Sequence, residues 1–247
     1  MPVTEQLIDV ATTGSGPMAV SVHHPEGEGQ HPAVIVIMEA FGLNPNIRGI
    51  GARLAAEGFV TAAPDLYHRS GRLNHAAYDQ LAARRAELRK GFDENSIMTD
   101  LEATLAQLRA DARVSGPIGI VGFCLGGRVS LLGAEHVPGI SAAAIFYGGG
   151  MMATTAETAA GWNAAADDVG RITCPIIGFF GNEDQNPAPA DVDKLDAAMT
   201  AAGVQHAFNR YDGAGHGFMC DERESHRPEA AADAWTKTVA FFHQHLG

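Results

Sequence analysis

Gly122-Phe123-Cys124-Leu125-Gly126-Gly127 separates an apolar run, Pro117 to Val121, from a stretch suited to a helix, Arg128 to Ala134. A strand, a sharp turn and a helix, with glycines on either side of a Cys or Ser at the turn, form a nucleophile elbow. Glycine suits both flanking positions, because a Cβ there would crowd the neighbouring strand or helix. The segment therefore predicts that the Cys124 side chain stands above the N-terminus of the following helix.

A thiol at such a corner indicates nucleophilic chemistry. The N-terminus of a helix favours negative charge, which helps a thiolate to form. The alternative is a buried structural cysteine in a glycine-rich loop, which is usual for an isolated Cys. The flanking pattern favours Cys124 as a nucleophile.

Around the elbow, short β-branched runs alternate with amphipathic helical stretches. This alternation is typical of an α/β fold with a mostly parallel sheet and helices on both faces. Two early extended pieces predict an N-terminal antiparallel hairpin at one sheet edge. Strands are expected at residues 7–10, 18–23, 33–38, 59–63, 117–121, 142–147, 175–180 and 206–211. Helices are expected at residues 47–57, 76–90, 100–110, 128–134, 190–202 and 228–245, with a turn at Asn95-Ser96 before the third.

The composition limits the classes of protein that need to be considered. The 247 residues show no internal repeat and no low-complexity linker, so one domain over residues 1–247 is expected. The formal net charge of −12, from 17 basic and 29 acidic residues, argues against nucleic acid and anionic membranes as partners.

The three cysteines indicate a reducing compartment. Cys124, Cys174 and Cys220 lack metal-ligand spacing, and an odd number makes a disulfide framework unlikely. Residues 1–10 show no signal-peptide pattern, and the apolar run at 33–38 is too short to span a bilayer. A soluble, cytoplasmic protein without membrane partners is expected.

A thiol nucleophile needs a base, and the base needs a group that orients it. In doubly wound sheets the reactive groups collect at the carboxyl ends of strands. Asp184 follows the expected strand at 175–180, and His216 follows the one at 206–211. The chain order Cys124, Asp184, His216 is the nucleophile–acid–base order of α/β-hydrolases.

These two assignments have alternatives. His216 has an unperturbed pKa suited to proton transfer near neutrality, although an isolated loop histidine is usually only solvated. Asp184 would hold the imidazole in the required tautomer. Glu183 is the rival for that role, but it lies one residue earlier and is expected to point elsewhere.

Glu39 ends the apolar run at residues 33–38, where a carboxylate is expected to be desolvated. One interpretation is a structural ion pair with Arg48 or Arg53. The other places Glu39 beside Cys124 at an adjacent strand end, where it exchanges a proton with the thiol and restrains it until substrate arrives.

An oxyanion hole requires two backbone donors directed at the developing charge. The N–H of Leu125, directly after the nucleophile, is expected to supply one of them. The other is expected from the loop after the first buried strand, at Ala40.

Taken together, the motifs resemble those of the dienelactone hydrolase (carboxymethylenebutenolidase) family over nearly the whole chain. The matching segments are Met38 to Asn44, Arg53 to Phe59, Ala63 to Tyr67, Gly122 to Gly127, Phe146 to Gly148 and Gly215 to Phe218. The resemblance implies a single-domain α/β-hydrolase fold and a Cys-His-Asp triad. It also implies a buried glutamate that is hydrogen-bonded to the thiol. Those roles fall on Cys124, His216, Asp184 and Glu39, and neither a metal nor an organic cofactor is implied.

The substrate-binding pattern departs from this family. The founding enzymes of the family hold the carboxylate of a dienelactone with two arginines. One of them lies four residues after the catalytic histidine, where this chain has Cys220. Arg223 is a candidate to replace that arginine from a shifted loop. Candidates for the second arginine are Arg84, Arg85 and Arg89, whose alternative is a solvated basic helix face. Loss of a bidentate carboxylate clamp is expected to weaken selection for acidic lactones.

The sequence thus predicts a thiol hydrolase of lactones or small carboxylic esters that works through an acyl-thioester. Phe41 and Tyr147 are expected to line an apolar acyl pocket. A broad carboxylesterase or acyltransferase without dienelactone preference is the near alternative. A redox-sensing thiol protein or a degenerate hydrolase acting as a scaffold are alternatives of other classes. A small-molecule substrate is the expected partner, and a monomer is favoured.

Overall fold

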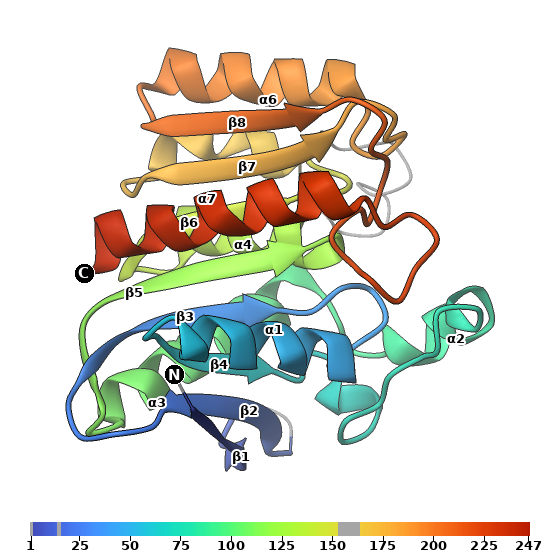
Figure 1. The fold of residues 1–247 in the computed structure, drawn as a ribbon. Helices are drawn as coiled ribbons and strands as arrows, with labels where there is room; N and C mark the ends of the chain where they lie inside the picture. Colours follow the sequence, from blue (N-terminus) through green and yellow to red (C-terminus); the bar gives the residue numbers. More distant parts are fainter. Residues whose placement is uncertain (1, 14–15, 153–163) are drawn as a thin grey trace. The chain divides into compact units, whose positions relative to one another are not determined.

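Strands and helices alternate along the computed structural model, which describes residues 2–13, 16–152 and 164–247 (Figure 1). The described chain groups into two units. The first unit comprises residues 1–119 with 246–247, and the second comprises residues 120–245. The single-domain organisation stays a prediction of the sequence.

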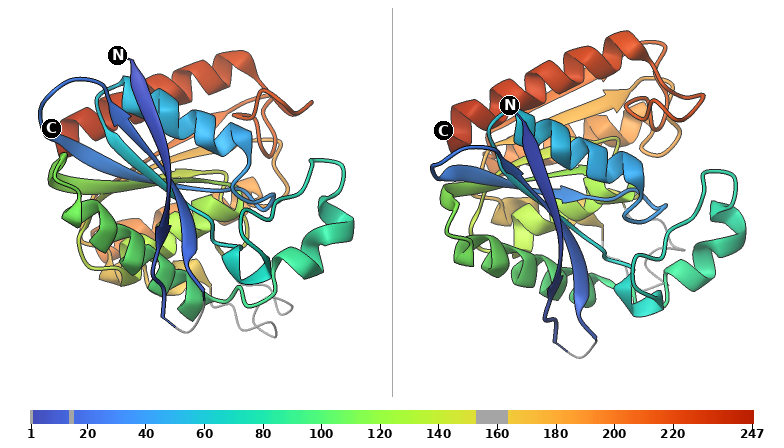
Figure 2. Two further views of the ribbon diagram at one scale, coloured as in Figure 1. Left: turned by 90° about the horizontal axis from the view of Figure 1, so that it is seen from below. Right: turned by 60° about the horizontal axis from the view of Figure 1, so that its bottom comes forward.

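Four strands of the first unit follow the order β1-β2-β4-β3. They are β1 (Val3–Val10), β2 (Met18–Pro25), β3 (His31–Ile37) and β4 (Val60–Pro64). β1 pairs antiparallel with β2, as the hairpin prediction requires, and the two strands run side by side in Figure 2. β2 is also antiparallel to β4, whereas β3 and β4 are parallel.

Helices α1 (Pro45–Ala56) and α3 (Glu94–Ala110) lie on opposite faces of these strands (Figure 2). The first unit also contains a short 3₁₀ helix, η1 (His68–Ser70), and helix α2 (Leu81–Leu88). β3 is buried on both faces, and Ala33 to Ile37 are fully inaccessible to solvent. Such a continuous apolar run is what a parallel strand covered on both sides requires.

The predicted boundaries of two helices were wrong. α3 begins at Glu94 rather than at residue 100, because Asp93 and Ser96 form a capping box. The Asp93 carboxylate accepts the Ser96 N–H at 2.8 Å, and the Ser96 hydroxyl accepts the Asp93 N–H at 3.0 Å. α2 is shorter than the predicted helix at 76–90, since the N–H of Ala76 bonds to the carbonyl of Phe41.

Strand β5 (Val114–Phe123) begins in the first unit and ends in the second. The strands that follow, β6 (Ile140–Phe146), β7 (Ile176–Gly181) and β8 (His206–Tyr211), are parallel to one another. The helices are α4 (Leu125–His136), η2 (Ala165–Asp167), η3 (Val169–Arg171), α6 (Pro189–Ala202) and α7 (Pro228–Leu246). α4 packs on β6, and α7 lies on the opposite face (Figure 1).

Three phenylalanines join the ends of β5, β6 and β7 in the second unit. The ring of Phe146 lies 4.6 Å from Phe123 and 4.5 Å from Phe179, and all three residues are buried. Offset aromatic contacts of this kind stabilise a core beyond their buried area. They give the turns that follow these strands a rigid base.

Within the described ranges, no helix combines the length and the apolar character needed to cross a membrane.

Candidate active site

Cys124 occupies the turn between β5 and α4, with φ 56° and ψ −118°. A positive φ is rare for a residue with a side chain and is strained. Two backbone hydrogen bonds hold the turn: Cys124 N donates to Phe146 O, and Gly127 N donates to Cys124 O, each at 3.0 Å. The strained backbone of the elbow thus places the half-buried thiol at the start of a helix.

Two glycines allow this turn to pack closely. A Cβ on Gly122 would overlap the carbonyl of Gly126 and lie 2.5 Å from the hydroxyl oxygen of Ser130. A Cβ on Gly127 would lie 2.6 Å from the carbonyl oxygen of Phe146. The reason for both glycines is therefore the close approach of backbone to backbone.

Gly122→Ala is expected to destabilise the protein by about 3 kcal/mol, because the neighbouring backbone must move to admit the methyl group. Urea denaturation measures this free energy. Gly170→Ala is the matched control, since nothing lies within 4 Å of a Cβ built on Gly170. Equal free energies of unfolding for the two variants would contradict the packing explanation.

The N-terminus of α4 provides an electropositive environment for the thiol. Leu125 is the first residue of this helix, and the first N–H groups of a helix lack intrahelical acceptors. With the helix dipole, these N–H groups favour an anion at this end of the helix. The position suits both a thiolate and an oxyanion.

His216 and Asp184 are brought together by the loops that follow β8 and β7. The Nδ1 of His216 lies 2.9 Å from Oδ2 of Asp184, and the imidazole also hydrogen-bonds to the Cys124 side chain. The Asp184 side chain is 2% exposed, whereas Glu183 is exposed to solvent. The structure therefore places Cys124, His216 and Asp184 in one hydrogen-bonded chain.

The hydrogen-bonded chain changes the protonation of the imidazole. Burial by itself lowers the pKa of His216, but the hydrogen bonds to Asp184 and Cys124 and the charges of those groups outweigh it. Together they raise the pKa of His216 to about 10. The two neighbours of the imidazole therefore favour its protonated form.

Tyr147 supports the imidazole from the side. It is 1% exposed with φ 38°, and its ring centroid lies 5.2 Å from that of His216 in an edge-to-face arrangement. The same ring lies 5.2 Å from Phe218. Tyr147 is therefore a buried neighbour of the imidazole, and its place in an acyl pocket stays a prediction of the sequence.

Sequence reasoning missed Asn186. Its backbone N–H donates to Oδ1 of Asp184 at 2.8 Å, and its side-chain oxygen accepts the N–H of Gly150 at 2.9 Å. Asn186 therefore fixes the Asp184 carboxylate and ties it to the loop after β6. The only signal in the sequence is the Asn-Pro pair, which is typical of a turn.

Glu39, Ala40 and Phe41 form the turn after β3 in the first unit. Glu39 is 1% exposed, and its carbonyl accepts the N–H of Gly42 at 3.1 Å. The carbonyl of Ala40 accepts the hydroxyl of Tyr67 at 3.1 Å. These contacts fix the peptide planes on both sides of Ala40.

Two contacts in the first unit concern residues that the sequence suggested for this site. Arg48, one of the two ion-pair partners considered for Glu39, binds Glu5 in a bidentate pair at 2.7 and 2.9 Å. The ring of Phe41 packs edge-to-face on Tyr78, with centroids 4.7 Å apart.

The candidate substrate arginines have different surroundings. Arg84 donates to the carbonyl of His75 and to the side chains of Asn74 and Glu87, so its guanidinium is engaged in the first unit. Arg85 on the same helix is exposed.

The remaining candidates lie in the loop that carries His216. Cys220 is buried there, and its N–H donates to the carbonyl of Gly217 at 3.1 Å. The guanidinium of Arg223 packs over Gly217.

Among the residues that the structure describes, no group of three or more His, Cys, Asp or Glu side chains is placed to hold a metal ion.

Comparison with known proteins identifies the class. A putative carboxymethylenebutenolidase of Synechocystis sp. is 39% identical, over 90% of this chain and 89% of that protein. The carboxymethylenebutenolidase of Rhodococcus opacus is 30% identical, over 95% of this chain and 89% of that enzyme. The crystal structure of a putative dienelactone hydrolase from Klebsiella pneumoniae superposes with a TM-score of 0.88 at 28% identity, covering 99% of this chain and 100% of that one.

The fold and these likenesses define a hydrolase with the α/β-hydrolase fold, as the sequence predicted. The dienelactone hydrolase family model matches residues 18–246, so the chain belongs to the dienelactone hydrolase family.

Proposed function

We propose that the protein hydrolyses lactones or small carboxylic esters with Cys124 as nucleophile, His216 as general acid and base, and Asp184 as its orienting carboxylate. One observation carries the proposal. Cys124, which has a strained backbone at a helix N-terminus, shares a hydrogen bond with His216. His216 is in turn hydrogen-bonded to the buried carboxylate of Asp184. These are the parts that an activated thiol nucleophile requires.

Acylation begins with attack of the Cys124 sulfur on the carbonyl carbon. A C–S bond forms, and the N–H of Leu125 stabilises the negative charge that develops on the carbonyl oxygen. When the tetrahedral intermediate collapses, the carbon–oxygen bond of the ester or lactone breaks. His216 gives its proton to the departing oxygen, which leaves an acyl-thioester.

Deacylation reverses these roles. His216, now neutral, takes a proton from water as the water oxygen attacks the thioester carbon. The C–S bond breaks, the carboxylic acid product departs, and the cysteine sulfur and the imidazole return to the state from which acylation began. Asp184 stabilises the imidazolium at both stages without taking up a proton.

The chemistry favours activated substrates. A thiolate leaves more readily than an amine or an unactivated alkoxide, so the intermediate proceeds to product only when the leaving oxygen is a good leaving group or is well protonated. Enol esters and enol lactones meet this condition. We therefore propose these as the preferred class. A preference for dienelactones requires an arginine that replaces the one absent at Cys220.

One experiment separates a hydrolase from a redox-sensing thiol protein. The reactions of wild type and His216→Ala with p-nitrophenyl acetate and with hydrogen peroxide are compared at pH 7.5. A hydrolase turns over the ester, and His216→Ala nearly abolishes turnover. A redox sensor reacts far faster with peroxide than with the ester, and His216→Ala changes that rate little.

The substrate class is tested by measuring rates on a dienelactone and on uncharged esters of graded acyl length. A preference for the dianionic lactone indicates a working carboxylate clamp. Equal rates indicate the broad carboxylesterase alternative.

The restraining role of Glu39 stays a prediction of the sequence. If a carboxylate holds back the thiol, Glu39→Gln is expected to raise the alkylation rate of Cys124 by iodoacetamide at pH 7 about 3- to 10-fold, since removing a like charge favours the thiolate. An unchanged rate would contradict this role.

The cytoplasmic location and the monomeric state likewise remain proposals, and light scattering after gel filtration tests the monomeric state.

A further inference from the structure

His216 lies in a long loop, residues 212–227, that connects β8 to α7; we refer to it as the His216 loop. Its first residues are tied to the turn that carries Asp184. Glu183 N donates to the carbonyl of Ala214 at 2.9 Å, and the Asn182 amide donates to the carboxylate of Asp212 at 2.6 Å. One side of the loop is therefore fixed relative to the carboxylate that orients the imidazole.

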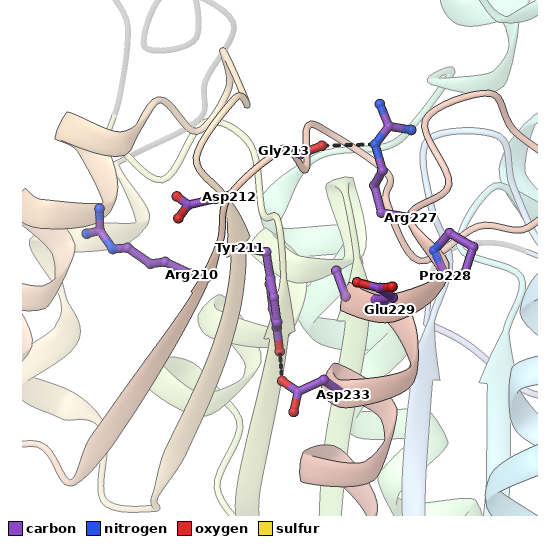
Figure 3. Close-up of a pocket in the computed structure, with 9 residues that line it drawn as sticks. Arg210, Tyr211, Asp212, Gly213, Arg227, Pro228, Glu229 and Asp233 are labelled. Carbon is purple, nitrogen blue, oxygen red and sulfur yellow. Dashed lines mark hydrogen bonds between the residues drawn. The ribbon is translucent and has the colours of Figure 1, made fainter.

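The far end of the loop is closed by one side chain. Arg227, directly before α7, reaches back across the loop, and its Nε donates to the carbonyl of Gly213 at 2.9 Å (Figure 3). One terminal nitrogen of the same guanidinium donates to the carbonyls of Glu224 and His226 at 3.1 and 2.9 Å. The backbone N–H of Arg227 also donates to the carbonyl of Phe218, at 3.0 Å.

The residue that follows His216 is held from the same end. The hydroxyl of Ser225 donates to the carbonyl of Gly217 at 3.2 Å. Gly217 has φ 79°, and a Cβ on it would overlap the guanidinium of Arg223. Hydrogen bonds from the end of the loop thus reach both sides of His216, at Gly213 and at Gly217.

We propose that Arg227 is a positioning residue for His216, and this inference rests on the proposed function. By joining Gly213 to the last residues of the loop, its guanidinium holds the imidazole within hydrogen-bonding distance of Asp184 and Cys124. Only a planar guanidinium supplies donors that span three carbonyls in this way. A lysine at this position offers a single ammonium nitrogen in place of the separate nitrogens of the guanidinium.

Arg210 provides a matched control. It lines the same surface recess as Arg227, together with Tyr211 and Asp233 (Figure 3). Its guanidinium is directed to α6, where it donates to the carboxylate of Asp193 at 2.5 Å. Removing Arg210 therefore takes a positive charge from the same recess without releasing the His216 loop.

The test compares Arg227→Ala, Arg227→Lys, Arg210→Ala and His216→Ala with wild type, by kcat and KM on p-nitrophenyl acetate from pH 5 to 11. Arg227→Ala is expected to lower kcat about 10- to 100-fold with little change in KM, because a small displacement of a catalytic group costs that much. The alkaline limb of the pH–rate profile of Arg227→Ala is expected to move to lower pH. An imidazole that is no longer held in place loses the hydrogen bonds that raise its pKa. Arg227→Lys recovers part of the rate, and Arg210→Ala matches wild type.

Two results would overturn the inference. In one, Arg227→Ala keeps the wild-type rate and pH profile. In the other, its rate falls by the same factor at every pH, in step with a loss of folded protein measured by thermal unfolding. Full activity in His216→Ala would instead refute the proposed function itself, so the two failures are distinguishable.

Discussion

Cys124→Ala is expected to lower kcat/KM on p-nitrophenyl esters and on a dienelactone by about 10³- to 10⁵-fold, the range found when a covalent nucleophile is removed. The methyl group cannot form the acyl-thioester, so only the oxyanion donors and substrate binding remain to assist attack by water. Steady-state kinetics at pH 7.5 measures the loss. The circular dichroism spectrum should stay unchanged, since the thiol is half-buried and alanine fits the same backbone.

Cys174→Ala is the matched control for that variant. Cys174 is buried away from the elbow, just before β7, and burial raises the pKa of its thiol to about 11. It is therefore expected to be a neutral core thiol, and its removal should leave kcat/KM within about twofold of wild type. Equal rates in wild type and Cys124→Ala would contradict the proposed mechanism.

Asp184→Asn is expected to lower kcat by roughly 10⁴-fold, because an amide in place of the carboxylate favours the wrong imidazole tautomer and no longer stabilises the imidazolium. The pH profile should change as well. The hydrogen bond from His216 to Asp184 helps to raise the pKa of the imidazole to about 10. Without this hydrogen bond the pKa of His216 falls, so the imidazolium loses its proton at a lower pH. The alkaline limb of the pH–rate profile is therefore expected to move to lower pH.

Glu183→Gln serves as the control, since it removes a carboxylate from the adjacent, exposed position. It is expected to keep the wild-type rate and profile. If Glu183→Gln rather than Asp184→Asn abolished activity, the orienting carboxylate would have been assigned to the wrong residue.

Much of the fold could be predicted because its signals are local. The apolar run at 33–38 and the alternation of strands and helices depend on burial and hydrophobic pattern, and both are visible in the sequence. The start of α3 was misplaced because its capping box uses Asp93 with Ser96, and serine at the third helical position lacks the usual Glu or Gln signature.

Part of the candidate site could likewise be predicted from the sequence, and part of it could not. That Cys124, Asp184 and His216 lie near one another could be predicted because each follows a strand, and parallel strands present their carboxyl ends on one edge. The contacts of Asn186 and Arg227 could not be predicted, since they are made with backbone groups of residues distant in the sequence. A hydrogen bond to a backbone group leaves no residue pattern, because almost every residue offers the same N–H and carbonyl.

The central claim is that Cys124 becomes acylated during turnover. Wild-type protein is mixed with p-nitrophenyl acetate, quenched in acid within the burst phase, and analysed by intact mass and by peptide mapping. We expect one added acetyl group on the peptide that contains Cys124. This group is released by hydroxylamine and is missing in Cys124→Ala. Turnover without that adduct, or an acetyl group on another residue with Cys124 unmodified, would contradict it.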